Sequence, residues 1–131
     1  MWKSRKDSFW LAEVPFLDLM VQAESKDEIG EMVKDAIELH IDDPSFMVAV
    51  TVAGDQLFIE SNNPKKLIAL ILKRQRLKKR LKLDEVSSHL AAKSINEYAQ
   101  YEQGKHLPSF EKFQQLLKAI DPNLEPVMTL R

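Results

Sequence analysis

Residues 81–107 read LKLDEVSSHLAAKSINEYAQYEQGKHL, and this stretch decides how the C-terminal half of the chain folds. Apolar residues in its first part share one helical face and predict a short helix: Leu81, Leu83, Val86 and Leu90. Residues 91–93 are predicted to form a turn. Ser94 is expected to cap a second helix, because a serine hydroxyl accepts a hydrogen bond from a free N–H two or three residues later. Gly104 is expected to end that helix in the left-handed conformation that glycine tolerates.

The second helix is predicted to have two chemically different sides. Its packed side consists of residues spaced i, i+3, i+4, which are Tyr98, Tyr101 and Glu102. Its opposite side collects side-chain amides, from Asn96, Gln100 and Gln103. Such amides pair with adenine through two hydrogen bonds in the DNA major groove, so the pattern predicts a helix-turn-helix that reads DNA. A helical pair that serves only for packing is the alternative interpretation.

Two segments of this stretch resemble known DNA-binding proteins. Residues 101–109, YEQGKHLPS, are similar to the end of the recognition helix in phage-repressor-like (Xre-type) domains. Residues 93–104, KSINEYAQYEQG, resemble the version found in HicB antitoxins, the DNA-binding partners of HicA toxins. The resemblance implies DNA contacts, which we assign to Lys93, Ser94, Ile95, Asn96, Glu97, Gln100, Gln103 and Lys105. It also implies that Arg76 pairs with Glu102, with Arg74 as a rival by position.

Residues 1–61 predict an antiparallel sheet that carries one helix. Aromatic and branched residues indicate strands at residues 2–6, 9–14, 19–23, 47–52 and 57–59. The last two flank a turn at residues 53–56, which is a hairpin pattern. Since a single helix covers one face of a sheet, the other face is expected to be free for water or a partner.

The helix of this half is predicted to begin after Ser25, with Glu28 three residues later completing a capping box. Apolar residues then recur at helical spacing as far as Ile41. The segments WLAEVP (residues 10–15) and DAIEL (residues 35–39) resemble the N-terminal domain of the same HicB family, a reduced RNase-H-like fold. For a toxin contact, the candidates are Phe9, Trp10, Glu13, Phe16 and Asp18. Phe9 and Trp10 belong to opposite pleat faces, so one is expected in the core.

The sequence Asn63-Pro64 predicts the boundary between a domain of residues 1–62 and a helical domain of residues 63–131. A basic helix follows, with nine Lys/Arg and no acid between residues 65 and 82. Ser109 is expected to cap the last helix. Its inward residues are predicted to be Phe110, Phe113, Leu116, Leu117 and Ile120.

Charge is divided unequally between the two halves of the 131 residues. Residues 1–63 hold 5 Lys/Arg and 13 Asp/Glu, a net charge of −8, whereas residues 64–131 hold 14 and 7, a net charge of +7. This division indicates one surface for a polyanion and one for a basic protein, or two halves that simply attract each other. The chain has no cysteine and no long apolar run, so a cytoplasmic, membrane-free protein is expected.

The sequence therefore predicts an α+β protein without catalysis, metal or cofactor. Its three histidines are far apart, and only Glu13 and Asp18 stand near strands in the first half of the sheet, too few for a two-metal nuclease. The resemblance implies an antitoxin that binds a HicA-type toxin and represses its own operon. It also implies double-stranded operator DNA as a partner and a homodimer or higher oligomer formed through the C-terminal domain. A stand-alone, ligand-responsive repressor and a metal-dependent nuclease are the alternatives.

Overall fold

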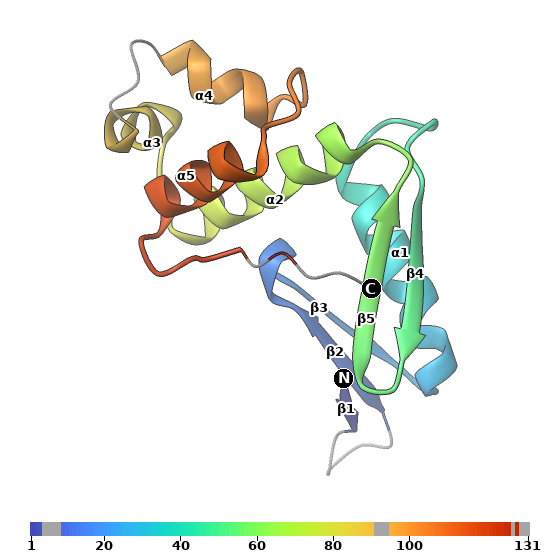
Figure 1. The fold of residues 1–131 in the computed structure, drawn as a ribbon. Coiled ribbons are helices and arrows are strands. Elements are labelled where there is room, and N and C mark those ends of the chain that lie inside the picture. Colours follow the sequence, from blue (N-terminus) through green and yellow to red (C-terminus); the bar gives the residue numbers. More distant parts are fainter. Residues whose placement is uncertain (4–8, 91–94, 127, 129–131) are drawn as a thin grey trace. The chain divides into compact units, whose positions relative to one another are not determined.

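The structure, a computed structural model, describes residues 1–3, 9–90, 95–126 and 128 of the chain (Figure 1). The backbone divides into two units, Met1–Pro64 and Lys65–Arg131, so the boundary falls after residue 64 instead of the predicted 62. Unit 1 contains antiparallel strands and one α-helix, and the described part of unit 2 is helical. The expected α+β class is confirmed at this level. Every helix of the described residues is too short or too polar to cross a bilayer.

Unit 1 contains two sheets. Three strands pair in the order β1-β2-β3, with bounds Trp2–Lys3, Trp10–Val14 and Leu19–Ala23, and the short helix η1 (Pro15–Leu17) joins β2 to β3. Two further strands, β4 (Val48–Ala53) and β5 (Gln56–Ser61), form a separate hairpin. The expectation of a single sheet is therefore wrong.

Helix α1 (Lys26–His40) explains why the strands remain in two sheets. It contacts β2 and β3 on one hand and β4 on the other, so both sheets bury apolar side chains against the same helix. Its fully buried residues are Ile29, Val33 and Ile37. β4 packs beside Gly30, where a Cβ would lie at an ordinary van der Waals distance, 3.6 Å, from Val52 Cγ2.

The two ends of α1 are held by different hydrogen bonds. At its start, Ser25 stands in the cap position but its hydroxyl makes no capping bond, so the predicted capping box is wrong. The Glu28 N–H donates instead to the Ser25 backbone carbonyl at 3.2 Å. This N–H is therefore already hydrogen-bonded without the Ser25 hydroxyl. Near its end, Glu38 Oε2 accepts from the Val48 N–H at 3.0 Å. This bond, and then the ammonium of Lys34, lowers the pKa of Glu38.

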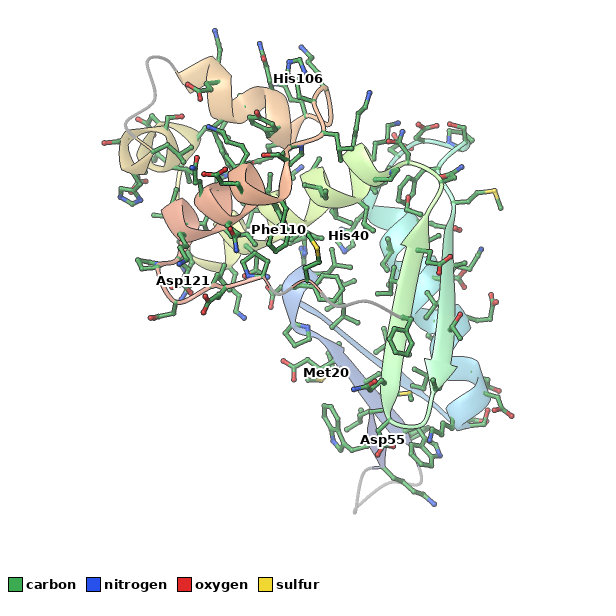
Figure 2. All side chains as sticks on the ribbon, viewed as in Figure 1. Met20, His40, Asp55, His106, Phe110 and Asp121 are labelled. Carbon is green, nitrogen blue, oxygen red and sulfur yellow. The ribbon has the colours of Figure 1, made fainter. Side chains whose placement is uncertain are left out.

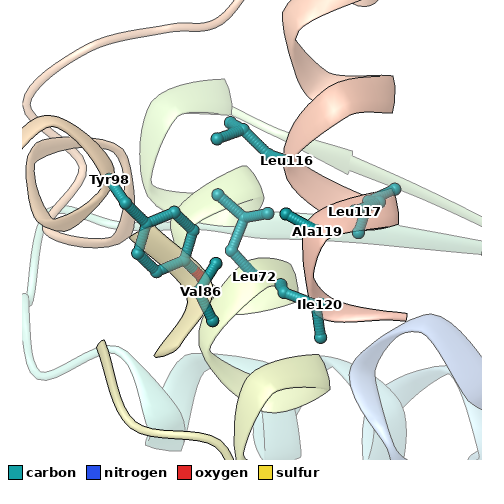
Figure 3. Close-up of a cluster of buried hydrophobic side chains, with 7 residues drawn as sticks. All are labelled: Leu72, Val86, Tyr98, Leu116, Leu117, Ala119 and Ile120. Carbon is teal, nitrogen blue, oxygen red and sulfur yellow. The ribbon is translucent and has the colours of Figure 1, made fainter. Parts of the chain in front are cut away.

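Unit 2 contains four helices in its described residues: α2 (Pro64–Lys78), α3 (Leu83–His89), α4 (Ile95–Glu102) and α5 (Phe110–Ile120). Their core consists of Leu72, Val86, Tyr98, Leu116, Leu117, Ala119 and Ile120 (Figure 3). The predicted cap of the last helix is confirmed, since Ser109 Oγ accepts from the Lys112 N–H at 3.1 Å. Phe110 is not inward as predicted: it is 37% exposed, because the first helical position lies beyond the buried stripe (Figure 2). The predicted turn at residues 91–93 and cap at Ser94 lie outside the described residues.

Two helices of unit 2 end in the same left-handed turn. Gly104 follows α4 with φ +76°, its N–H donates to the Tyr101 carbonyl, and the Lys105 N–H donates to the Gln100 carbonyl. This double bond pattern is the Schellman motif, as expected for a glycine that ends a helix. Arg80 takes the equivalent place after α2 with φ +57°. A side chain with a Cβ is strained in this conformation.

We expect Arg80→Gly to stabilise unit 2 by about 1 kcal/mol, because glycine removes the left-handed strain at the end of α2. The matched variant Gly104→Ala should destabilise unit 2 by a similar amount, about 1 kcal/mol, because it introduces that strain. Urea unfolding followed by the helical circular dichroism signal measures both variants. Tryptophan fluorescence serves as a reference, since both tryptophans lie in unit 1. Midpoints that move in the same direction for the two variants would contradict the assignment.

Candidate nucleic-acid interface

The position of α4 is set by an ion pair with α2. The Arg76 guanidinium meets the Glu102 carboxylate through two atoms, with Nε 2.9 Å from Oε2 and Nη2 2.7 Å from Oε1. The side chains are only 13% and 8% exposed. Hydrogen bonding to Glu102 raises the pKa of Arg76 above its ordinary value. The predicted pair is present, and it is Arg76 rather than Arg74 that makes it.

Arg76 also fixes the chain at the end of its own helix. Its Nη1 donates to the Leu81 carbonyl at 2.8 Å, just beyond the left-handed residue Arg80. The same guanidinium therefore connects α2, the turn before α3 and the last turn of α4. Planar two-point contacts of this kind restrict orientation more tightly than a single contact does.

The packed side of α4 is completed by Tyr98, whose side chain is fully buried in the core of unit 2 (Figure 3). Its hydroxyl has no hydrogen-bond partner among the described residues. Burial, followed by the nearby Glu102 carboxylate, raises the pKa of Tyr98 far above its ordinary value, so the hydroxyl stays neutral. Packing by Tyr98 and the ion pair at Glu102 together assign one side of α4 to the interior.

The other side of α4 faces solvent and carries two of the three predicted amides, and the third, Gln103, directly follows the helix. Asn96, Gln100 and Gln103 are all exposed, as the helical spacing predicted. Lys105 is exposed just after the helix. The structure thus brings the three amides together on one free surface, which we call the amide face.

The remaining predicted DNA contacts are placed differently. Glu97 is exposed but its Oε1 lies 3.2 Å from Lys112 Nζ of α5, so this carboxylate already has a cationic partner. Ile95 is the first residue of α4. Lys93 and Ser94 lie outside the described residues.

The sequence interpretation missed His106, whose Nε2 lies 2.9 Å from Gln100 Oε1. Its ring also meets the ring of Tyr101 edge-on, with centroids 6.1 Å apart. The signal in the sequence is Gly104: a left-handed residue after a helix reverses the chain and brings the next residues back beside the last turn. Helical spacing alone does not predict this contact, because His106 lies beyond the end of the helix.

The predicted toxin contacts of unit 1 are mostly exposed. Phe9 and Phe16 are 36% and 45% exposed, and Glu13 and Asp18 are exposed as well. Trp10 is half-buried, with Lys26 Nζ 5.5 Å from the centroid of its ring. The expectation that one of Phe9 and Trp10 lies in the core is wrong: neither is buried, and Phe9 precedes β2.

The three-stranded sheet carries one apolar residue that the prediction omitted. Met20 is 61% exposed and stands opposite Glu13 in the ladder between β2 and β3. Met20 shares a face with Glu13 because directly opposed residues of an antiparallel pair point to the same side, and alternation within each strand does not fix this register. No group of three or more His, Asp or Glu with metal-binding geometry occurs among the residues that the structure describes.

A hollow of about 380 Å³ lies at one end of the β4–β5 hairpin. It is lined by Met47, Val48, Ala49, Glu60, Ser61 and Asn62. Most of these residues are exposed, so the hollow does not enclose a small molecule as ligand-sensing pockets do.

We expect Glu102→Gln to destabilise unit 2 by about 3 kcal/mol, because it leaves the Arg76 guanidinium largely buried without its counter-ion. Glu97→Gln is the matched control on the same helix. It breaks an ion pair at a position that is 44% exposed and should cost less than about 1 kcal/mol. Urea unfolding of unit 2 measures both. Equal losses would mean that the ion pair does not hold α4.

Comparisons with known proteins identify no relative: no protein-family model, curated protein or solved structure matches this chain.

Proposed function

We propose that the chain is the antitoxin of a type II toxin–antitoxin pair, of the HicB type. Unit 2 binds operator DNA as a dimer and represses its own operon. Unit 1 binds a HicA-type, mRNA-cleaving toxin and blocks it. The observation that carries the proposal is the amide face of Asn96, Gln100 and Gln103. These residues are exposed on α4 and directly after it, and the other side of this helix is fixed by packing and an ion pair.

The DNA-binding part is supported by two kinds of interaction, hydrogen bonds to bases and attraction to phosphates. Side-chain amides form two-point hydrogen bonds to base edges in the major groove. α4 presents two of them, Asn96 and Gln100, and Gln103 follows directly after the helix. The net charge of +7 on residues 64–131 supplies sequence-independent attraction to phosphates. Exposed cations of α2 and the turn after it suit this role: Lys73, Lys78, Arg80 and Lys82.

The toxin-binding part is supported by the surface and charge of unit 1. The net charge of −8 on residues 1–63 favours a basic partner. Phe16 and Met20 are large apolar side chains left substantially exposed, which is the composition of an interface anchor. Glu13 lies opposite Met20 in the ladder and supplies a negative charge beside the latter.

We expect Asn96→Ala to weaken binding to the operator by about 1–3 kcal/mol and to relax the base preference at one position, because it removes a two-point base contact. The matched control is Asn123→Ala, an exposed asparagine after α5 that lies outside the amide face. The measurement is a fluorescence-anisotropy titration of the full chain with duplex DNA from upstream of its gene, at fixed salt. Wild-type affinity and base preference in Asn96→Ala would refute this assignment.

For the toxin we expect that co-expression of the chain with the small basic protein encoded next to it restores growth, and that the two purify together. Glu13→Lys should weaken this complex at least about fivefold, because it places a positive charge against a basic partner. Glu60→Lys, at an exposed position of β5 in the other sheet, makes the same charge change and should bind like the wild type. The dissociation constants come from calorimetry.

Two results would contradict this part of the proposal. Absence of a partner and of rescue would favour the stand-alone repressor. Equal effects of Glu13→Lys and Glu60→Lys would show that net charge, and not the β1-β2-β3 face, determines toxin binding.

A further inference from the structure

The amide of Gln100 is not a free reading group, because His106 holds its oxygen. His106 Nε2 lies 2.9 Å from Gln100 Oε1, and both residues are exposed. Figure 2 labels His106. A carbonyl oxygen only accepts hydrogen bonds, so the imidazole donates through Nε2–H. The NH₂ group of the Gln100 amide does not take part in this hydrogen bond.

The backbone places His106 where it can make this contact. The Lys105 N–H donates to the Gln100 carbonyl at 3.0 Å, and Gly104 has φ +76°, so the chain reverses directly after α4. His106 therefore returns beside the residue whose carbonyl closes the turn. The backbone bond and the side-chain bond both end on Gln100.

The imidazole is itself supported from the other side. The Tyr101 ring meets it edge-on, with centroids 6.1 Å apart and an interplanar angle of 65°. Lys112 Nζ lies 5.9 Å from the centroid of the Tyr101 ring and 3.2 Å from Glu97 Oε1. These contacts join α4, the loop after it and α5, so His106 is placed by more than one neighbour.

We propose that His106 is a positioning residue that fixes the Gln100 amide with its NH₂ group toward DNA, and so directs this position of α4 to guanine. The inference rests on the proposed DNA-binding function. A rotating glutamine amide offers either a donor or an acceptor and pairs well with adenine N6 and N7. With its oxygen engaged by His106, the amide offers two donors, and guanine N7 and O6 are both acceptors.

The test is a selection from random duplex DNA with the full chain, comparing wild type, His106→Ala, Gln100→Ala and the double variant. We expect the wild type to prefer guanine over adenine at one position of each half-site by at least about fivefold. His106→Ala should reduce that preference to about twofold or less while the other positions keep theirs. The double variant should match Gln100→Ala, because His106 acts only through Gln100.

Two further variants separate positioning from a structural role. His106→Gln keeps a side-chain N–H donor and should restore part of the guanine preference. Gln115→Ala, an exposed glutamine of α5, should leave every preference unchanged. Thermal unfolding of His106→Ala should equal that of the wild type, since a bond between two exposed side chains contributes little to stability.

Nitrogen NMR of the DNA-free chain tests the same contact directly. We expect a proton on Nε2 of His106 and an ordered Gln100 side-chain amide that becomes mobile in His106→Ala. A bare Nε2, or a Gln100 amide that is equally mobile in both proteins, overturns the inference. If the wild type and His106→Ala select the same sequence, the inference is overturned but the DNA-binding function is retained. A wild type that selects no sequence overturns both.

Discussion

The ion pair between Arg76 and Glu102 is the constraint on which the chemistry of unit 2 depends. α4 has eight residues, fewer than an isolated helix needs for stability in water, so its structure and its orientation come from tertiary contacts. A single carboxylate in its last turn, held at two points, decides which side of the helix faces inward. Because the Glu102 side chain is buried on one side of α4, the amide face on the opposite side is exposed to solvent.

Burial of the ion pair has a cost that the neighbouring packing offsets. Removing two charges from water is unfavourable unless their geometry is good, and here each nitrogen of the guanidinium has an acceptor, at Glu102 or at the Leu81 carbonyl. Tyr98 contributes a large apolar surface beside the pair, although its hydroxyl finds no partner among the described residues.

The periodicity of the sequence correctly predicted the elements that depend on contacts between residues close in the chain. The alternation of residues 10–14 and 19–23, the helix ending at Gly104 and the cap at Ser109 follow from bonds between near neighbours in the chain. The errors have different causes. The strands form two sheets that both pack against α1, a tertiary arrangement that residue spacing does not specify. The capping box is absent because the Glu28 N–H donates to the Ser25 backbone carbonyl, a local bond that competes with the hydroxyl. His106 was missed because a turn, and not a helical period, brings it to Gln100.

The chemistry of α4 is therefore determined from outside α4. Arg76 of α2 decides which side is exposed, Lys112 of α5 engages Glu97, and His106 engages the oxygen of Gln100. Without these neighbours, the Glu97 carboxylate would be free to accept hydrogen bonds and the Gln100 amide would be free to rotate. With these contacts in place, the exposed surface offers hydrogen-bond donors from a fixed amide at Gln100 and a carboxylate already neutralised at Glu97. Under the proposed DNA-binding function, such a surface favours acceptor-rich base edges, so the residues that contact α4 contribute to the proposed specificity as well as the residues of α4 itself.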